Sequence, residues 1–461
     1  MFKNIVKGTG FTSVDPKNIR ILENTLFCIS ETGSIAKIIQ PNEKDYEELS
    51  ESYSAADKLV ELKKGQYILP GFVDLHVHAP QWAQTGTALD LPLYEWLNTY
   101  TFPLEAKFSD LEFAEKVYSD LVSQLLRNGT TTALYFATVH RKASYRLAEI
   151  CSEKGQRGLV GKVVMDDKEQ NPEFYRDDTA ESAIAETELF IKEVQALNKH
   201  TPQGVYPVVT PRFIPSCTDE SLRGLGALAK KYDVHIQSHC SESDWAHEFV
   251  KERFGKNDAF ALNEFGLLSE KAVMAHCGFL SDQDMRLFSE TGTAVAHCPI
   301  SNAYFGNAVT PIAKLLNDYQ VQVGLGSDVS GGFSPSLFDN VRQAVISSRM
   351  LEDGVDNNCC SEKRGVKNSS ITLNEAFYLA TAGGGNSLSM PIGKLEVGFA
   401  WDIQIIDTKN LPIFSEEESL ADLFQKILYL SRPENIKEVW VQGKKVHENT
   451  LGLGVYKENV R

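Results

Sequence analysis

What the sequence lacks argues against three classes of protein. No apolar run approaches the ~20 residues of a transmembrane helix, and the N-terminal residues contain no signal-peptide core. The eight cysteines include no C-x-x-C pair, which indicates reduced thiols rather than a disulfide framework. Basic residues form only short pairs in a chain of net charge −16, which disfavours a nucleic-acid or anionic membrane surface. We therefore expect a cytoplasmic protein that binds neither membrane nor nucleic acid.

The 461 residues suffice for a (β/α)8 barrel of roughly 250 residues and an accessory domain. Short runs rich in Val, Ile and aromatic residues alternate with stretches of helical periodicity such as 112–128 and 221–232. The runs lie at 72–78, 131–138, 158–166, 206–213, 234–239, 272–277, 293–298 and 320–328. We predict that they form the parallel strands of a TIM barrel. An open doubly wound sheet is the alternative, but no G-x-G-x-x-G follows the first run.

The two ends of the chain predict a second domain. Strand-like runs flank the barrel on both sides, at 25–30, 35–39, 401–406 and 438–442. The charged connector 43–49 is interpreted as a solvated loop. We predict a small β-sandwich domain built from residues 1–68 and 392–461, with the catalytic barrel at 69–391 inserted between them.

Metal-binding residue types occur where the predicted strands end, the position at which a barrel of this kind carries its reactive groups. His76 and His78 share one face of strand one, because side chains two residues apart on a strand point the same way. His239 ends strand five and Asp328 ends strand eight. These four side chains predict one divalent metal site with an open position for water. Zinc suits such ligands, and Fe(II) accepts the same set.

Groups for proton transfer are found at the same strand ends. A water molecule on the metal would have a pKa near neutrality, and Asp328 can take its proton. Glu242, three residues after His239, is placed to act as a proton shuttle. The alternative for Glu242 is a carboxylate that only stabilises the start of the next helix. His276, near the end of strand six, can polarise the water or hold a developing charge.

Several segments resemble those of metal-dependent guanine deaminases in the amidohydrolase superfamily. They are 70–81, 95–97, 100–103, 128–132, 209–213, 237–242, 297–299 with 301–302, and 324–328. The resemblance runs from the mid-60s to about residue 445. The H-x-H and His-Cys-Pro motifs occur throughout the superfamily, whereas the Thr-Phe-Pro and Thr-Pro-Arg-Phe runs are more specific. The Pro80-Gln81 pair departs from relatives, which often carry a small polar residue before the glutamine.

The resemblance implies a substrate, a cofactor and an assembly. It implies one Zn2+ per subunit, held by His76, His78, His239 and Asp328. It implies guanine as substrate, with Gln81 and Arg212 hydrogen-bonding the purine edges and Phe213 stacking on the ring. Further substrate contacts would come from His239, Glu242, His276 and Asp328, and the subunit would form a homodimer. No lysine closes strand four, where binuclear relatives carry a carboxylated one, and this favours a single metal ion.

The predicted reaction is hydrolysis of guanine to xanthine and ammonia in purine catabolism. One rival is a related deaminase acting on cytosine, a triazine or an adenosine derivative, which Gln81 and Arg212-Phe213 disfavour because they suit a planar oxopurine. The other is a non-catalytic barrel, which the complete ligand set and Glu242 disfavour.

Six further side chains receive secondary assignments. We place His140 at the functional face, His297 as an orienting group, Trp82 in the core, and His200, His247 and His447 on the surface. The segment 357–370 is given no function.

Overall fold

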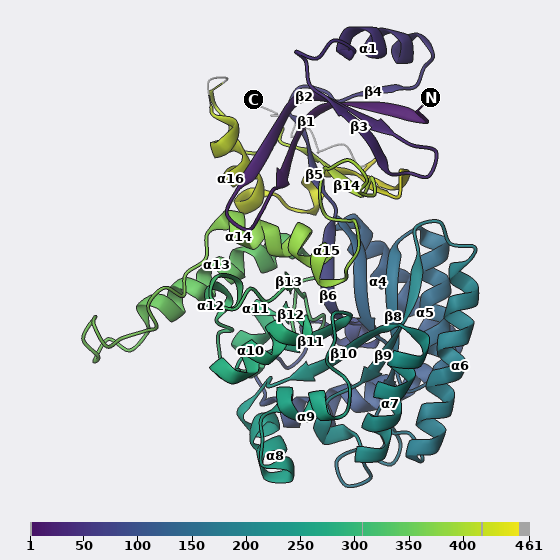
Figure 1. Ribbon diagram of the computed structural model, residues 1–461, viewed down its shortest axis with the longest axis vertical. Helices are drawn as coiled ribbons and strands as arrows, with labels where there is room; N and C mark the ends of the chain where they lie inside the picture. Colours follow the sequence, from purple (N-terminus) through teal and green to yellow (C-terminus); the bar gives the residue numbers. More distant parts are fainter. Residues whose placement is uncertain (1, 307, 416–417, 451–461) are drawn as a thin grey trace, which may run out of the picture.

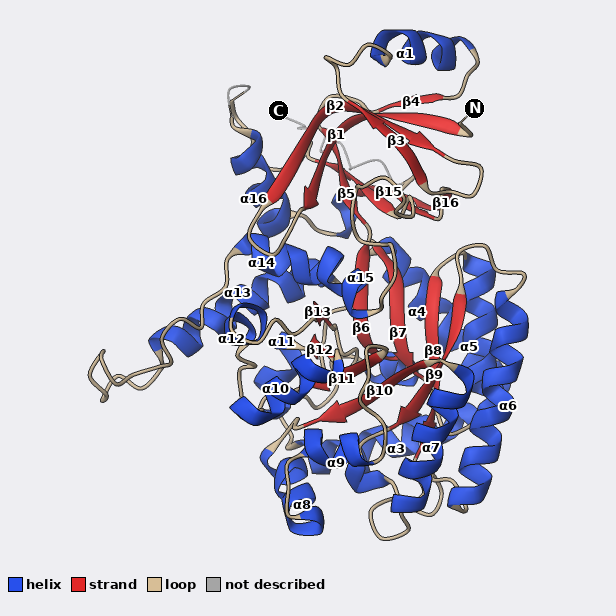
Figure 2. Ribbon diagram, viewed as in Figure 1, coloured by secondary structure: helices blue, strands red, loops and turns tan. Residues whose placement is uncertain are grey.

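The eight apolar runs form the predicted parallel barrel in the computed structural model, which describes residues 2–306, 308–415 and 418–450 (Figures 1 and 2). The strands follow chain order: β6 (Phe72–His78), β7 (Thr130–Phe136), β8 (Arg157–Val164), β9 (Val205–Pro211), β10 (His235–Cys240), β11 (Ala272–His276), β12 (Ala294–His297) and β13 (Val323–Leu325). Nearly all of their side chains are buried, which explains why the runs are apolar without alternation.

Backbone hydrogen bonds complete the barrel between its first and last strands. The Asp328 amide donates to the His76 carbonyl at 2.8 Å, and the His78 amide donates to the Val329 carbonyl at 2.8 Å. β13 ends at Leu325 rather than at Asp328. The predicted run 320–328 is longer than β13 at both ends, and the backbone is left-handed at both of its terminal residues, with φ 55° at Gln320 and 48° at Asp328.

Helices surround the strands, and local capping fixes where they begin and end. The Asp110 carboxylate accepts hydrogen bonds from the amides of Glu112 and Phe113, which starts α4 (Leu111–Arg127), and Gly129 at φ 82° follows its end. The other helices around the barrel are α5 (Arg141–Lys154), α6 (Ala180–Asn198), α7 (Asp219–Tyr232), α8 (Asp244–Phe254), α9 (Asp258–Glu264), α10 (Asp282–Thr291), α11 (Pro299–Ser301), α12 (Ile312–Asn317), α13 (Leu337–Asp353), α14 (Leu373–Tyr378) and α15 (Gly384–Ser387).

A run of short helical turns, here called the mouth segment (79–109), connects β6 to α4. It contains a 3-10 turn at Ala79–Gln84, α2 (Leu93–Trp96), a π-helical turn at Leu97–Thr101, α3 (Phe102–Glu105) and a 3-10 turn at Ala106–Ser109. Such π-helical turns are rare and occur mostly at functional sites. The mouth segment supplies several side chains to the cavity described below.

Both ends of the chain build the small β domain. Its strands are β1 (Asn4–Ser13), β2 (Ile19–Ile29), β3 (Ile35–Ile39), β4 (Leu59–Glu61), β5 (Gln66–Pro70), β14 (Ile403–Asp407), β15 (Ile436–Val441) and β16 (Lys444–Glu448). Hydrogen bonds join them in one mixed sheet of order β16-β15-β14-β5-β1-β2-β3, with β4 beside β1. Phe27 of β2 packs against Trp401 with ring centroids 5.3 Å apart, so the two ends share a core. Helix α16 (Leu420–Leu430) lies at the side of the small β domain that faces α13 and α14 (Figure 1).

The segment 43–49 is not the solvated loop that its charges predict. Helix α1 (Tyr46–Ala55) begins within it, and Tyr46 is only 3% exposed. The Tyr46 ring packs beside Ile5 and Leu26, and its hydroxyl donates to the Asn24 carbonyl at 2.6 Å. Tyr46, with the partly buried Leu49 and Tyr53, therefore anchors an otherwise polar helix to the sheet.

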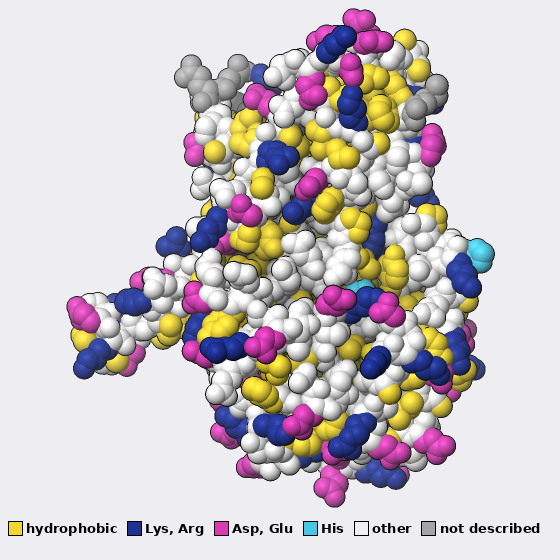
Figure 3. Space-filling view, in the orientation of Figure 1, with side chains coloured by type: hydrophobic (Ala, Val, Ile, Leu, Met, Phe, Trp, Pro, Cys, Tyr) yellow, Lys and Arg dark blue, Asp and Glu magenta, His cyan; other side chains and the backbone are white. Residues whose placement is uncertain are grey.

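The projecting arm, residues 354–370 at the end of α13, extends away from the rest of the structure (Figure 1). It carries Cys359 and Cys360, both exposed, whereas the other six cysteines are buried and all eight are free. On the face drawn in Figure 3, acidic and basic side chains are interspersed rather than gathered by sign. None of the helices in the described part of the chain is both long and apolar enough to cross a bilayer.

Candidate active site

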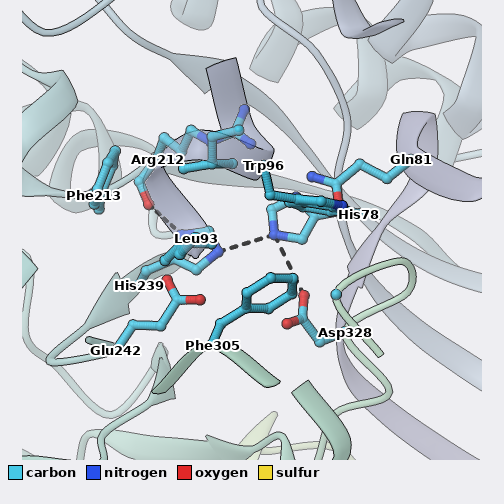
Figure 4. A pocket seen from close by; sticks show the side chains of 12 residues that line it. His78, Gln81, Leu93, Trp96, Arg212, Phe213, His239, Glu242, Phe305 and Asp328 are labelled. Atoms are coloured by element: carbon cyan, nitrogen blue, oxygen red, sulfur yellow. Dashed lines mark hydrogen bonds and ion pairs between the residues drawn. The ribbon is translucent and has the colours of Figure 1, made fainter. Parts of the chain in front are cut away.

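The four predicted metal ligands converge at the carboxyl end of the barrel, where Figure 4 shows His78, His239 and Asp328 close together. Nε2 of His78 lies 2.9 Å from Nε2 of His239. Oδ1 of Asp328 lies 3.2 Å from Nε2 of His76 and 3.6 Å from Nε2 of His78. All four side chains are buried. The fold thus brings together ligands from β6, from β10 and from the turn after β13. The first and the last of them, His76 and Asp328, are 252 positions apart in the sequence.

The spacing and protonation of these groups fit a single divalent ion. Two ligand atoms at ~2.0–2.1 Å from a tetrahedral zinc ion lie about 3.3 Å apart, close to the separations just given. Nε2 of His76 is buried and has no hydrogen-bond partner. Burial and the neighbouring imidazoles lower the pKa of His78 and His239 well below the usual range. Both rings are therefore neutral at pH 7, the form that binds a metal.

A competing ligand group, His76, His276 and Cys298, fits a metal less well. Burial raises the pKa of the Cys298 thiol well above its usual range, so the thiolate that a metal needs is disfavoured. The Cys298 sulfur lies 3.5 Å from the Ala296 carbonyl oxygen, a hydrogen-bond partner that also suits a thiol. The set with Asp328 is the better fit.

Hydrogen bonds on the far side of two imidazoles fix which nitrogen faces the site. Nδ1 of His239 donates to the Arg212 carbonyl at 2.6 Å, which leaves its Nε2 unprotonated and directed at His78. Nδ1 of His276 donates to Oδ1 of Asn302 at 2.9 Å. The Asn302 amide is itself oriented, because its nitrogen donates to the Thr310 hydroxyl at 3.1 Å.

The sequence-based prediction did not include Asn302 as an orienting residue, and it assigned such a role to His297 instead. His297 is buried, and its Nδ1 has no hydrogen-bond partner. The available signal for Asn302 was its place in the 301–302 pair, three residues after Pro299, which resembles the corresponding part of guanine deaminases.

Left-handed backbone residues lie at three of the strand ends that carry the site. Ser241, His276 and Asp328 have φ values of 49°, 69° and 48°. Each conformation is uncommon for a residue other than glycine, and such strain concentrates at functional sites. At these positions the chain leaves its strand abruptly and directs side chains into the barrel mouth.

Glu242 lies beside His239 (Figure 4). Its Oε1 is 3.5 Å from Nε2 of His276, and the side chain is 9% exposed. Burial, and then the charge of Asp328, raises the pKa of Glu242 to about 8. The N-cap of α8 is Ser243, which accepts from the Ala246 amide, whereas Glu242 lines the cavity. Glu242 is thus free to face the cavity.

A cavity beside the predicted metal ligands is lined by aromatic and polar side chains from distant elements (Figure 4). Gln81, Arg212 and Phe213, all predicted for substrate binding, line it together with His78, Leu93, Trp96, Leu97, His239, Glu242, Phe305, Asp328 and Gly331. His76 and His276 lie deeper. The Phe213 ring lies 6.3 Å from the His239 ring. A flat, partly polar molecule fits such a lining.

Glu105 is the principal residue that the sequence did not reveal. It is completely buried in α3 and accepts a hydrogen bond from Nε2 of Gln81 at 2.9 Å. Its two oxygens also accept from the Arg212 guanidinium, at 2.6 and 3.2 Å. Its position two residues after the Thr-Phe-Pro run was the available signal.

Asp74 was also not predicted. Its Oδ1 accepts from the amides of His76 and Ser327 at 3.2 and 2.9 Å, which connects strand one to strand eight. Burial raises the pKa of Asp74 to about 7.

The remaining predicted side chains lie away from the cavity. His140 precedes α5. Nε2 of His235 donates to the Leu388 carbonyl at 3.0 Å, at the opposite end of the barrel. Trp82 packs in the core and its indole donates to Asp120. His247 is not a surface residue: it is 7% exposed and lies 3.0 Å from Asp258 Oδ2. Its polar sequence neighbours concealed this buried pair.

Comparison with known proteins gives one consistent result. The amidohydrolase family model matches residues 67–446. A guanine deaminase of Dictyostelium discoideum is 38% identical over 463 residues, covering 96% of this chain and 98% of that protein. The Homo sapiens guanine deaminase is 39% identical over 461 residues, with 96% of each chain covered. A solved guanine deaminase from C. acetobutylicum, with guanine bound in its active site, has a TM-score of 0.86 and 30% identity, covering 96% of this chain and 100% of that chain.

Proposed function

The chain belongs to the amidohydrolase family, and from this premise we propose that it is a guanine deaminase that hydrolyses guanine to xanthine and ammonia. One observation carries the proposal. The cavity joins a cluster of imidazoles and carboxylates to the Arg212-Phe213 pair and Gln81, so hydrolytic groups and groups suited to a planar oxopurine face the same space. Full-length similarity to guanine deaminases supports that substrate over cytosine or a triazine.

We propose one Zn2+ per subunit, held by His76, His78, His239 and Asp328. The buried, unpaired Nε2 of His76 and the close spacing of the four ligand atoms support a single ion. When bound, zinc acidifies a water molecule so that a hydroxide nucleophile is available near neutral pH. Two hydrogen bonds to the backbone hold the ligands in place. The Asp328 amide donates to the His76 carbonyl, and the Arg212 carbonyl accepts from Nδ1 of His239.

Proton transfer falls to Asp328 and Glu242 in this proposal. Asp328 takes a proton from the water whose oxygen forms the new bond to C2 of guanine. Glu242, with a pKa of about 8, carries a proton at neutral pH and gives it to the adjacent ring nitrogen. The C2–N bond then breaks as the proton held by Asp328 passes to the amino group, which leaves as ammonia. The remaining proton on the C2 hydroxyl returns to Glu242 as the C2 carbonyl of xanthine forms. His276, whose Nε2 lies between the two carboxylates, stabilises the developing charge.

Recognition of guanine rests on three side chains at the cavity wall. Arg212 offers N–H donors to the C6 carbonyl, and Gln81 offers both a donor and an acceptor to an edge that has both. Phe213 covers the face of the ring. An adenine edge, with an amino group in place of the carbonyl, would set donor against donor at Arg212.

We further propose a cytoplasmic homodimer that acts in guanine catabolism. The resemblance to guanine deaminases supports the assembly and the pathway. The eight free cysteines support a reducing compartment.

The decisive experiment measures xanthine release from guanine by the purified full-length chain, with adenine and cytosine as competing substrates and zinc content determined in parallel. We expect turnover of guanine alone at about one zinc per subunit. Stoichiometric zinc without turnover of guanine would reject the substrate while leaving the metal site intact. Absence of bound metal after purification with zinc present would reject the ligand set.

A further inference from the structure

We infer that Glu105 is a positioning residue that sets specificity for the 6-oxo group by holding Arg212 and Gln81 in register. The inference rests on the proposed function, because it concerns how the same cavity recognises guanine. Glu105 is 0% exposed and does not line the cavity, so any effect on the substrate passes through its partners.

The first step of the argument is the geometry of the ion pair. Glu105 holds two guanidinium nitrogens of Arg212, at 2.6 and 3.2 Å, through both of its carboxylate oxygens. This bidentate contact fixes the plane of the guanidinium as well as its position. The Phe102 ring, on the same short helix α3, lies 5.1 Å from the guanidinium carbon and supports it from a second direction.

The second step is the orientation of Gln81. A carboxylate only accepts hydrogen bonds, so Glu105 requires the nitrogen of the Gln81 amide on its side, 2.9 Å away. The amide oxygen of Gln81 then lies toward the Ser330 amide, at 3.4 Å. One buried carboxylate therefore determines both which atoms Gln81 presents and where the Arg212 donors stand.

The third step is charge. Arg212 is 3% exposed, and an unpaired cation at that depth would favour an anionic ligand. Glu105 neutralises it inside the wall, so that the guanidinium acts as a hydrogen-bond donor to an uncharged carbonyl. Burial would lower the pKa of Arg212, but the charge and hydrogen bonds of Glu105 raise it overall. This balance suits a neutral purine base rather than a phosphorylated or carboxylated one.

Glu105→Gln tests the inference, because it keeps the shape of the side chain and removes its charge. The two substrates are guanine and 2-aminopurine, which retains the reacting 2-amino group but lacks the 6-oxo group. We expect kcat/KM for guanine to fall roughly 10- to 100-fold, the size expected for loss of a charged hydrogen bond. The kcat/KM for 2-aminopurine, which has no 6-oxo group for Arg212 to contact, should change less than about threefold. Discrimination between the two should therefore collapse.

The controls separate positioning from general damage. Glu112→Gln removes an exposed carboxylate at the start of α4 and should leave both values unchanged. Zinc content of Glu105→Gln should match the wild type. If that variant does not accumulate as folded protein, Glu105→Asp, which keeps the charge at a shorter reach, should show the same selective loss for guanine.

If Glu105→Gln lowers kcat/KM equally for guanine and 2-aminopurine, or leaves the ratio of the two values unchanged, the inference is overturned. The proposed function still stands in that case, provided that the wild type deaminates guanine. A wild-type protein that turns over neither base would overturn the proposed function and the inference with it.

Discussion

Arg212 and His239 are coupled through the Arg212 carbonyl, which accepts hydrogen bonds from Nδ1 of His239 at 2.6 Å and from the His239 amide at 3.1 Å. The residue whose guanidinium lines the cavity thus also fixes, through its backbone, the nitrogen that an imidazole offers to a metal. Strands β9 and β10 are neighbours in the barrel, which is why the two functions meet there. A shift of the β9 end would disturb substrate recognition and metal binding together.

Glu242→Gln should abolish turnover and leave the metal bound. The amide keeps the volume of the side chain but cannot shuttle a proton, and general acid–base catalysis contributes about 10²–10⁴-fold. Steady-state kinetics with guanine, together with zinc analysis of the same sample, check this. Near wild-type kcat in the variant would remove Glu242 from the mechanism.

Removal of the metal should cost both activity and stability. Chelation leaves three buried imidazoles and one buried carboxylate without the ion that they bind, so we expect loss of turnover and a lower Tm, both restored by added Zn2+. His78→Ala should bind zinc more weakly, whereas His235→Ala, at the far end of the barrel, should bind it normally. Full activity in thoroughly chelated protein would contradict the zinc assignment.

Asn302→Ala should lower kcat for guanine by about 10- to 100-fold, because His276 loses the acceptor that fixes its tautomer. Asn302→Asp keeps an oxygen acceptor at the same place and should retain more activity. The measurement is kcat for the two variants with zinc content matched to the wild type. Indistinguishable kcat values for the alanine variant and the wild type would show that the tautomer of His276 does not matter.

The joint between the two domains should depend on one buried ion pair. Arg157 in β8 contacts Asp402 before β14, and both side chains are at most 4% exposed. Removing one partner leaves an uncompensated buried charge, so we expect Asp402→Ala to lower the free energy of unfolding by about 3–5 kcal/mol.

Arg223→Ala is the matched control for that measurement. Its partner Asp219 is 3.8 Å away and Arg223 is 67% exposed, so the loss should stay below about 1 kcal/mol. Urea unfolding at pH 7 compares the two variants, and equal effects would show that burial of the pair contributes nothing.

Much of the fold follows from sequence periodicity alone. Each barrel strand corresponds to a short, unbroken apolar run in the sequence, because a strand covered on both faces has no polar side. His76 and His78 share a face by the period of two, and His239 and Asp328 follow their strands in sequence. The predicted metal ligands meet because parallel strands bring their carboxyl ends to the same edge of the barrel. This follows from the strand topology, which the sequence pattern predicts.

Tertiary structure decided what no local pattern encodes. Glu105 reaches Arg212 across 107 positions and Asn302 reaches His276 across 26, and the two partners of each pair lie on different elements of the fold. Tyr46 and His247 are buried although their sequence neighbours are polar, because a surface that receives them is built by distant segments. Periodicity reports which face of an element a residue occupies. The partner it finds there depends on how separate elements are packed, and only the folded chain fixes that.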